Sequence, residues 1–599
     1  MKKLLLDTYP LKKIVEGNYL YVDKTDLIAE MVSFPEAQLF FSRPRRFGKS
    51  MLLNIIKSIF QDEPSLFAGL KIMTSGYKFI KRPVIRLDMS IDSTSPEALD
   101  KSLFAMLNAI ARDNGFALEK NFPPGSSLKA LIDAFYDPCS KVNLMPEGDA
   151  KEKTKELAKA TDRLTPVVLL IDEYDFPINS KLNNPSLAKE NSEILHDFYA
   201  SLKTASQDGK LHFTLLTGVT RYAMMGISAG LNNLKDISFD PKYAALCGFT
   251  YEELDEYYTD FFPLVLKETI SDGTSPANFT LADLRQKVLD FYDSYSWDGR
   301  TKILNPYSIV HFFDEKKFSY FWSNTGSSLR FLTHVFGNSP NTFLPGNMTQ
   351  IEVADCKSPI LVDDPPTIPL LLQTGYLTIN EITTSEGVEY YNLVVPNKEV
   401  ARSVAGELGK VFFSERLINK NAEKNDMTNA ILGKNAKDLT KIMNSFFNGV
   451  VHVHQAKYDG HDPPETESYY HCMLWAYFKG LFKNAEMEVP GSVGNLDLIV
   501  NVQPKAYAVI EIKYEKSTKE VEVEEEKPAQ KKKITGKKVK KAAPNDINKT
   551  LNDLAMLALD TIEKKRYGLS YRVPGNTVID IGVGIYGRGE SLAIFEKTE

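Results

Sequence analysis

Residues 43–50 (RPRRFGKS) combine the residue types that bind the phosphates of a nucleotide. Gly48 lets the backbone approach a phosphate closely, and Lys49 would reach the β- and γ-phosphates. Ser50 carries a hydroxyl of the kind that binds Mg²⁺ in such loops. The sequence therefore predicts a site for ATP and Mg²⁺.

The loop lies in the context that phosphate binding requires. An apolar run at 37–42 predicts a strand before it, and an amphipathic pattern at 50–60 predicts a helix after it. The N-terminus of that helix would add partial positive charge and free N–H groups. Arg43 stands where the usual GxxxxGK[ST] pattern has its first glycine, and we count it with Arg45 and Arg46 among the residues expected to bind the nucleotide.

A second apolar run, residues 167–173 (VVLLIDE), ends in two carboxylates. It predicts a buried strand of the Walker B type, in which Asp172 would hold Mg²⁺ through water and Glu173 would polarise the attacking water. The alternative is a core strand that ends in solvated acids. The loop upstream favours the catalytic interpretation.

A third run, residues 213–221 (FTLLTGVTR), ends in polar residues. Thr217 and Arg221 are candidates to sense the γ-phosphate. A threonine at the end of a strand also serves as a cap, so both interpretations stay open for this segment.

Near the C-terminus, residues 495–502 and 506–513 are alternating apolar runs that predict a β-hairpin with a three-residue loop. Pairing about Pro504 would set Asp497 opposite Glu511, with their Cβ atoms roughly 5 Å apart. Lys513 would project from the same face as Glu511.

Opposed carboxylates destabilise a hairpin unless a cation neutralises them, and carboxylate oxygens suit Mg²⁺ or Mn²⁺. Two carboxylates, a metal ion and a lysine form a set of groups that can hydrolyse a phosphodiester. The alternative is the common one for an ExK sequence, a solvated strand edge.

The elements that would position these residues follow the pattern of an α/β protein. A further strand is expected at 83–87, and helices at 251–260 and 281–295. We predict four regions: an α/β domain at 1–245, a helical lid-like region at 246–345, a mixed connecting domain at 346–463, and an α/β domain at 464–599.

Composition excludes several classes of protein. The 599 residues carry a formal net charge of −6, so there is no overall basic character of the kind that nucleic-acid binding favours, although a local patch would suffice. Four widely spaced cysteines without a CxxC pattern fit reduced thiols in a cytoplasmic protein, with the nucleus also open. The first residues lack the long apolar region of a signal peptide, and no run has the length of a membrane span. The sequence leaves open whether the chain forms a homo-oligomer.

Residues 515–543 contain an acidic block followed by a basic block and few large apolar side chains. Such a segment cannot bury enough apolar surface to fold, so we predict a disordered insertion. It would act as a solvated spacer or as a flexible lysine-rich arm that binds phosphates.

Several further segments make the chain similar to the AAA-ATPase-like family of uncharacterised proteins. They are LYVDKTDLI, SRPRRFGKS, LLIDEYDFPI, LTGVTRYA, NPYSIVHFF, QTGYLTI and VPNKEV. The family has arginine at the first loop position, so the resemblance accounts for Arg43. It also implies that Asp23 and Lys24 belong to a family motif.

The C-terminal pattern D-x13-E-x-K resembles the PD-(D/E)xK nuclease core, which commonly follows this ATPase domain. The resemblance implies a restriction-endonuclease-like domain with Glu467 as a further metal-site carboxylate, on a helix before the hairpin. It also implies a helix at 551–567 with a QIxxKxY motif. Here Thr561 stands at the glutamine position.

Together these patterns predict an ATP-binding, ATP-hydrolysing protein whose C-terminal domain is a Mg²⁺-dependent nuclease acting on DNA or RNA. The alternative is a nucleotide-dependent switch or scaffold whose nuclease-like domain binds nucleic acid or a partner without cutting.

Overall fold

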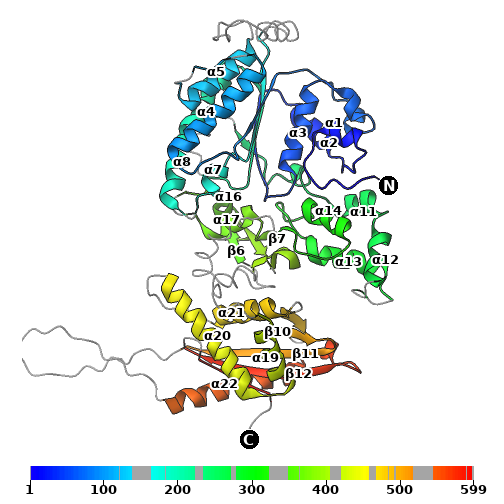
Figure 1. Cartoon of the computed structure of the whole chain (residues 1–599), viewed down its shortest axis with the longest axis vertical. Coiled ribbons are helices and arrows are strands. Elements are labelled where there is room, and N and C mark those ends of the chain that lie inside the picture. The colour runs from blue at the N-terminus through cyan, green and yellow to red at the C-terminus, as the bar shows by residue number, and fades with distance from the viewer. Residues whose placement is uncertain are drawn as a thin grey trace, which may run out of the picture. The chain divides into compact units, whose positions relative to one another are not determined.

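The computed structural model describes seven main stretches of the chain, which run from 2–137, 164–222, 234–322, 349–404, 420–457, 467–516 and 544–595. Short gaps within them lie at 116, 120–121, 183, 272–274, 276–277, 363–364, 402, 483–484, 492–493 and 588–589. The chain divides into two compact units at Val400, and residues 348–400 group with the N-terminal one (Figure 1). The region at 346–463, expected to be one connecting domain, is therefore divided between the two units.

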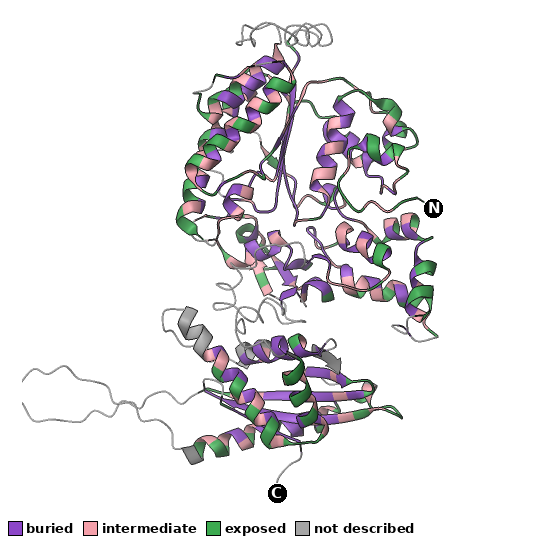
Figure 2. Cartoon of the chain, viewed as in Figure 1, coloured by how far each residue is buried: buried purple, intermediate pink, exposed green. Residues whose placement is uncertain are grey.

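The N-terminal unit is built on a parallel five-stranded sheet with the order β2-β3-β4-β1-β5. Its strands are β1 (Ala37–Ser42), β2 (Val84–Asp88), β3 (Val167–Asp172), β4 (Leu211–Gly218) and β5 (Lys235–Asp236). The strands expected from apolar runs at 37–42, 83–87, 166–171 and 213–217 are confirmed to within two residues at their ends. All six residues of β3 are buried, as its unbroken apolar sequence requires (Figure 2).

Helices cover both faces of this sheet (Figure 1). α3 (Lys49–Phe60) lies on one face near α1 (Leu11–Glu16) and α2 (Thr25–Val32). The other face carries α4 (Pro96–Asp113), α5 (Pro124–Tyr136) and α8 (Pro185–Ala200), with the short helices α7 (Phe176–Asn179) and α9 (Leu202–Gln207) beside them. The leucines that recur every four residues along α4 are fully buried, which is why this amphipathic helix packs where it does.

In the described part of the lid-like region, four helices pack around an aromatic core. They are α11 (Tyr251–Tyr258), α12 (Phe262–Ser271), α13 (Leu281–Tyr292) and α14 (Pro306–Glu315). Thr250 and Thr280 begin α11 and α13 with capping boxes. The helix expected at 281–295 ends at Tyr292, because Tyr295 leaves the helix to form a β-bridge with Ile303.

An antiparallel sheet with the order β6-β8-β7 completes the N-terminal unit. It consists of β6 (Thr349–Glu352), β7 (Thr378–Ser385) and β8 (Val388–Val394), and it is flanked by α16 (Val353–Lys357) and α17 (Thr367–Thr374).

The C-terminal unit is a mixed sheet with the order β13-β12-β11-β10-β9. β9 (Ala485–Gly491), β10 (Gly494–Gln503) and β11 (Ala506–Glu515) form an antiparallel meander. β12 (Thr577–Tyr586) then runs parallel to β11, and β13 (Glu590–Ile594) runs antiparallel to β12. The helices are α19 (Lys420–Leu432), α20 (Ala436–Lys457), α21 (Glu467–Leu481) and α22 (Pro544–Lys565).

The hairpin of β10 and β11 has the predicted register but a shorter turn. Leu498 pairs with Ile510, so Asp497 is the next position opposite Glu511. The expected three-residue loop is a two-residue turn with a bulge after Asn501, because Lys505 adopts a left-handed conformation with φ of 64°. Most of the insertion expected at 515–543 lies outside the described residues, since the structure leaves out 517–543. No helix within the described stretches combines the length and apolar character needed to span a bilayer.

We expect Gly582 to be required for the contact between β12 and α22. A Cβ atom at this position would lie 2.2 Å from the carbonyl oxygen of Ala555 and 2.8 Å from Cγ of Leu559. Gly582→Ala should therefore lower the free energy of unfolding by about 1–3 kcal/mol, the usual cost of overpacking. Thermal unfolding followed by circular dichroism measures this.

Gly480→Ala on α21 is the matched control, because a Cβ atom there meets nothing within 4 Å. Its melting temperature should be unchanged or slightly raised, since alanine favours a helix. Equal melting temperatures for the two variants would contradict the close approach of α22 to the sheet.

Candidate functional site

The loop at 43–50 connects β1 to α3 with two residues in left-handed conformations. Gly48 directly precedes the helix with φ of 95°, and Arg46 has φ of 70°. Glycine is favoured at the first of these positions because it adopts positive φ without strain. The turn leaves the N-terminus of α3 at the end of a central strand, where backbone N–H groups attract an anion.

The side chain of Lys49 is held by hydrogen bonds to the loop at 43–50. Its Nζ donates hydrogen bonds to the carbonyl oxygens of Arg43 at 2.9 Å and Pro44 at 3.0 Å. Burial lowers the pKa of Lys49, and the nearby carboxylates of Glu173 and Asp172 act in the opposite direction. A buried ammonium group thus lies at the loop with acidic side chains close by.

Arg43 points away from the phosphate side of the loop. Its fully buried guanidinium donates to the carbonyl oxygens of Ser42 at 2.9 Å and Ser238 at 2.7 Å. It also lies over the rings of Phe41 and Trp297, at 4.4 and 4.1 Å from their centroids. The geometry therefore places Arg43 as an anchor of the loop rather than as the phosphate ligand that we expected.

The other two arginines differ from Arg43 in exposure. Arg46 is exposed, and its guanidinium lies 4.9 Å from the ring centroid of Tyr307. Arg45 is half-buried, and its carbonyl oxygen accepts a hydrogen bond from Nε1 of Trp322 at 3.3 Å. Both side chains lie on the loop itself, next to Gly48.

Asp172 is fixed from two sides at the end of β3. The hydroxyl of Thr217 donates to Oδ1 at 2.8 Å, and Nη2 of Arg86 lies 3.1 Å from Oδ2. Arg86 also donates to Oδ1 of Asn54 on α3. Thr217, predicted as a phosphate sensor or a cap, positions the carboxylate of Asp172 in this structure. The sequence analysis missed Arg86 and Asn54, although Arg86 is the lone basic residue within the strand VIRLD.

Glu173 follows β3 in a left-handed conformation with φ of 48° and is half-exposed. Its Oε2 accepts a hydrogen bond from the hydroxyl of Ser90 at 3.0 Å, and Ser90 is in turn bonded to Asp88 at 2.6 Å. The strained backbone turns this carboxylate away from the strand axis, at the same sheet edge as Asp172.

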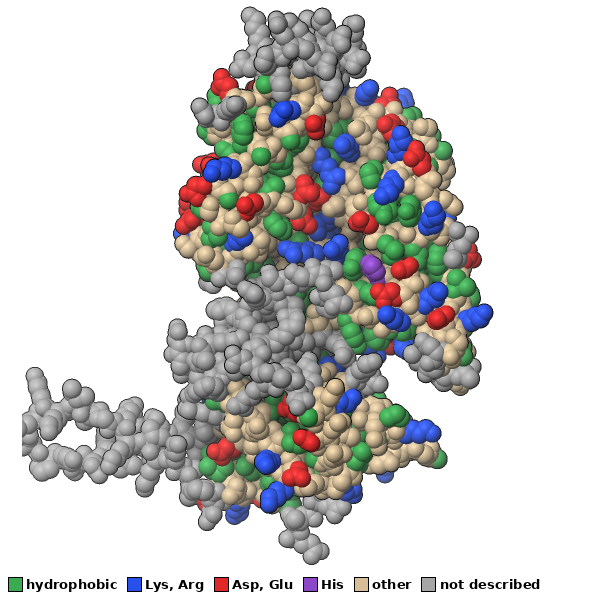
Figure 3. Space-filling view, viewed as in Figure 1, with side chains coloured by type: hydrophobic (Ala, Val, Ile, Leu, Met, Phe, Trp, Pro, Cys, Tyr) green, Lys and Arg blue, Asp and Glu red, His purple; other side chains and the backbone are tan. Residues whose placement is uncertain are grey.

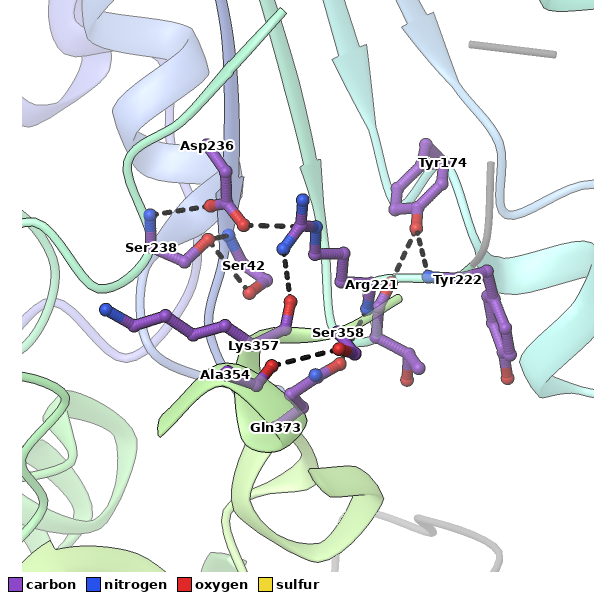
Figure 4. Close-up of polar contacts among 11 residues, drawn as sticks. Ser42, Tyr174, Arg221, Tyr222, Asp236, Ser238, Ala354, Lys357, Ser358 and Gln373 are labelled. Carbon is purple, nitrogen blue, oxygen red and sulfur yellow. Dashed lines mark hydrogen bonds and ion pairs between the residues drawn. The ribbon is translucent and has the colours of Figure 1, made fainter. Parts of the chain in front are cut away.

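Arg221 is engaged by the segment around α16 and α17 (Figure 4). Its Nε lies 3.3 Å from Oδ2 of Asp236, and its Nη1 donates to the carbonyl oxygen of Lys357. Its backbone N–H donates to Oε1 of Gln373 at 2.7 Å. In this structure Arg221 joins β4 to the small antiparallel part of the unit, and the contact of its guanidinium with Asp236 directs it away from Asp172.

A cavity of about 170 Å³ borders the loop at Arg46, Phe47 and Gly48. Its walls are mainly apolar and come from the N-terminal segment, α2, α3, α11 and α14. They include Leu6, Thr8, Tyr21, Ile28, Met51, Leu246, Tyr258, Tyr307 and His311. The sequence analysis did not find this cavity, because its residues come from distant segments without a shared motif.

The DKT segment at 23–25 lies at this cavity and connects it to α11. Nζ of Lys24, which lines the cavity, forms an ion pair with Oε2 of Glu253 at 2.5 Å. Asp23 accepts hydrogen bonds from the backbone N–H of Thr25 at 2.9 Å and of Lys71 at 2.7 Å. These contacts give the motif a structural role, which the sequence alone did not supply.

In the C-terminal unit, Asp497, Glu511 and Lys513 lie together on one face of the hairpin. Oδ2 of Asp497 accepts a hydrogen bond from the N–H of Ile512 at 2.7 Å, and Nζ of Lys513 lies 2.9 Å from Oε1 of Glu511. Burial, followed by the charge of Asp497, raises the pKa of Glu511. Nε2 of His471 on α21 lies 3.7 Å from Oδ2 of Asp497, a neighbour that the sequence analysis missed.

Asp497 and Glu511 fit a small divalent cation because one buried carboxylate oxygen is left to bind it. Glu511 is only 2% exposed, and its Oε2 is buried without a hydrogen-bond partner among the described residues. The described side chains contain no group of three or more His, Cys, Asp or Glu residues that could hold a metal ion. Mg²⁺ is commonly held by one or two carboxylates and several waters, so the pair of Asp497 and Glu511 is chemically sufficient.

The resemblance also implied roles for Glu467 and Thr561, and the structure adds little on either residue. Glu467 is the first residue of α21, but its side chain lies outside the described residues. Thr561 lies within α22, where its hydroxyl donates to the carbonyl oxygen of Leu557 in the preceding turn at 2.9 Å.

Comparison with known proteins gives a family match within the N-terminal unit and a distant relative that covers most of the chain. Residues 8–228 match the model of a family described as Predicted AAA-ATPase. The chain is also 27% identical, over 504 residues, to a protein of Azotobacter chroococcum mcd 1 described as "Uncharacterized protein in vnfD 5'region". That match covers 83% of this chain and 87% of the relative. The family match includes the loop at 43–50, Asp172 and Arg221 and indicates nucleotide binding, whereas it ends before the C-terminal unit.

We predict that Lys49→Ala weakens binding of Mg²⁺-ATP by about 10- to 100-fold, because hydrogen bonds to a charged group contribute about 1.5–3 kcal/mol. Isothermal titration of the purified full chain measures this, with circular dichroism to establish that the variant is folded. Lys57→Ala in the last turn of the same helix is the control and should bind like the wild type. Undiminished ATP binding by Lys49→Ala would remove the loop from the nucleotide site.

Proposed function

We propose, from the likeness of residues 8–228 to predicted AAA-ATPases, that the N-terminal unit binds and hydrolyses ATP with Mg²⁺. The observation that carries this proposal is the meeting of Lys49, Asp172 and Glu173 at one edge of the parallel sheet. β1, β3 and β4 end in register there, since Ser42 pairs with Gly218 and Ile171 with Leu216. Ligands of open α/β sheets bind at this carboxyl edge of the strands.

The cavity beside the loop supports a nucleotide as the ligand. It is apolar and is lined by aromatic side chains such as Tyr307, as suits the flat face of a nucleobase. Of the loop, Arg46 and Gly48 line one end of the cavity, where the phosphates would be. One ligand with an aromatic base and a polyphosphate chain would therefore meet matching surfaces at both ends.

Each residue would have a defined part in hydrolysis. Lys49 would bind the β- and γ-phosphates, and Ser50 and Asp172 would hold Mg²⁺, whose charge stabilises the phosphate oxygens. Thr217 and Arg86 keep the Asp172 carboxylate in place. Glu173 would orient and polarise the attacking water.

We expect Glu173→Gln to bind ATP with nearly wild-type affinity and to hydrolyse it at least tenfold more slowly. The amide keeps the shape and the hydrogen bond to Ser90 but is a much weaker base than a carboxylate. Titration gives the affinity, and phosphate release gives the rate. Glu190→Gln, an exposed change on α8, is the control and should leave both values unchanged. Equal loss of binding and turnover in Glu173→Gln would instead indicate a structural role.

A second candidate function concerns the C-terminal unit, which we propose is a Mg²⁺- or Mn²⁺-dependent nuclease acting on DNA or RNA. Asp497, Glu511 and Lys513 lie together as such a site needs, and one buried oxygen of Glu511 has no hydrogen-bond donor among the residues that the structure describes. The order of helix, three-stranded meander, helix and parallel strand fits the restriction-endonuclease-like domain that the sequence resemblance implies.

In this proposal Asp497 and Glu511 would hold the metal, which supplies a polarised water and neutralises charge on the phosphate. Lys513 would exchange its contact with Glu511 for the scissile phosphate. The drawn face of the C-terminal unit carries both signs of charge among the described residues, so binding would depend on the site rather than on a broad basic field (Figure 3). A scaffold that binds nucleic acid or a partner without cutting is the alternative, and Thr561 at the glutamine position favours it.

We predict that Asp497→Asn eliminates any metal-dependent cleavage and leaves ATP hydrolysis unchanged, because the two sites lie in separate units. The assay uses single- and double-stranded DNA and RNA with Mg²⁺, Mn²⁺ or Ca²⁺, in the presence and absence of ATP. Ca²⁺ should bind without supporting cleavage, since it tolerates a looser geometry.

Asp553→Asn, an exposed change on α22, is the control and should cut like the wild type. Wild-type protein that cuts no substrate with either Mg²⁺ or Mn²⁺ would favour the scaffold. Cleavage that persists in Asp497→Asn would place the nuclease elsewhere.

A further inference from the structure

Glu399 is a buried carboxylate that the proposed chemistry does not use. It lies in the VPNKEV segment after β8 and has no exposed surface. Burial raises its pKa to about 7, and the groups that donate hydrogen bonds to it are neutral. An ionisable group buried among neutral donors lowers stability at neutral pH, so its presence needs a reason beyond packing.

One carboxylate oxygen of Glu399 is hydrogen-bonded to the helix that lines the cavity. The hydroxyl of Ser308 donates to Oε2 at 2.7 Å. Ser308 lies in the first turn of α14, which Asn305 caps through the N–H groups of Tyr307 and Ser308. The same helix presents Tyr307 and His311 to the cavity. The bond to Glu399 therefore fixes the helix that forms this wall.

The other carboxylate oxygen of Glu399 is connected through Trp322 to the loop at 43–50. The backbone N–H of Trp322 donates to Oε1 of Glu399 at 2.8 Å. Nε1 of the same Trp322 donates to the carbonyl oxygen of Arg45 at 3.3 Å. The indole is buried and packs edge-to-face against Tyr376, with ring centroids 5.2 Å apart, so it has little freedom to turn. Glu399 thus orients the donor that contacts the loop.

We propose that Glu399 is a positioning residue of the nucleotide site, which holds the phosphate loop and the base-side wall of the cavity in register through Trp322 and Ser308. The proposal rests on the proposed nucleotide function. It explains why one buried carboxylate serves two donors from separate segments: both ends of one ligand must be bound at a fixed separation. An apolar side chain of the same size would fill the space but would accept no hydrogen bond from Trp322 or Ser308.

The test is titration of the full chain with Mg²⁺-ATP, tripolyphosphate and adenosine. Glu399→Ala should raise the Kd for ATP about tenfold. Glu399→Gln should stay within about threefold of the wild type, because its amide oxygen accepts from Trp322 while its amide group donates to the Ser308 oxygen. Glu389→Ala, an exposed change on β8, is the control and should not alter binding.

Two further variants separate positioning from a general loss of stability. Trp322→Phe should weaken ATP and tripolyphosphate binding and spare adenosine, because it removes only the donor to Arg45. Ser308→Ala should weaken ATP and adenosine binding and spare tripolyphosphate. This crossed pattern is expected even if Glu399→Ala does not fold.

Each contrary result has its own meaning. Wild-type protein that does not bind ATP would refute the proposed function itself. Wild-type protein that binds ATP, together with a folded Glu399→Ala that binds it equally well, would overturn the positioning role alone. Uniform weakening of all three ligands by both Trp322→Phe and Ser308→Ala would also overturn it.

Discussion

The buried guanidinium of Arg43 is the constraint on which the proposed nucleotide site depends. It lies over the rings of Phe41 and Trp297 and donates to the carbonyl oxygens of Ser42, at the end of β1, and Ser238, just after β5. Removing a guanidinium from water is costly, and here several carbonyl acceptors and two aromatic faces offset that cost. Burial lowers its pKa only to about 10, so it stays charged at neutral pH.

This anchor gives the loop a shape that glycine would otherwise supply. Arg43 does not adopt a positive φ, so the first position of the loop needs no glycine, and the left-handed turns fall on Arg46 and Gly48. With the start of the loop fastened to the sheet edge, Lys49 can bond to the carbonyl oxygens of Arg43 and Pro44. The departure from the usual motif is therefore a change in how the loop is held, and the part that would face a phosphate under the proposed function is kept.

The sequence predicted those features that depend on local pattern. Apolar runs predicted four of the five strands of the parallel sheet and missed the short β5, and alternation on both sides of Pro504 predicted the hairpin register that sets Asp497 opposite Glu511. It did not predict the direction of Arg43 or the engagement of Arg221 by Asp236, because both depend on contacts between distant segments. A charged residue beside a phosphate-binding loop carries no local signal of whether it points toward the ligand or into the protein.

The cavity and the contacts that hold its walls could not be predicted from the sequence for the same reason. Tyr307 belongs to a segment that was recognised only as a resemblance, and nothing in its spacing relates it to the loop at 43–50. Lys24 and Glu253 are more than two hundred positions apart, yet they form one ion pair at the edge of the cavity. Pair contacts of this kind follow from the fold, so they become visible only when the fold is known.

The two acidic sites differ in how their charge is compensated before any ligand binds. Asp172 already has a hydroxyl donor and an arginine, so its negative charge is largely balanced within the protein. A metal ion there would gain most of its stabilisation from the phosphates that arrive with it. Glu511 has one oxygen paired with Lys513 and, within the described part of the chain, one buried oxygen without a donor, beside a second carboxylate. A cation at this second site would relieve repulsion and desolvation that the protein leaves uncompensated. Under the proposed functions, the N-terminal site therefore favours a metal that arrives with its nucleotide, whereas the C-terminal site favours a metal bound by the protein alone.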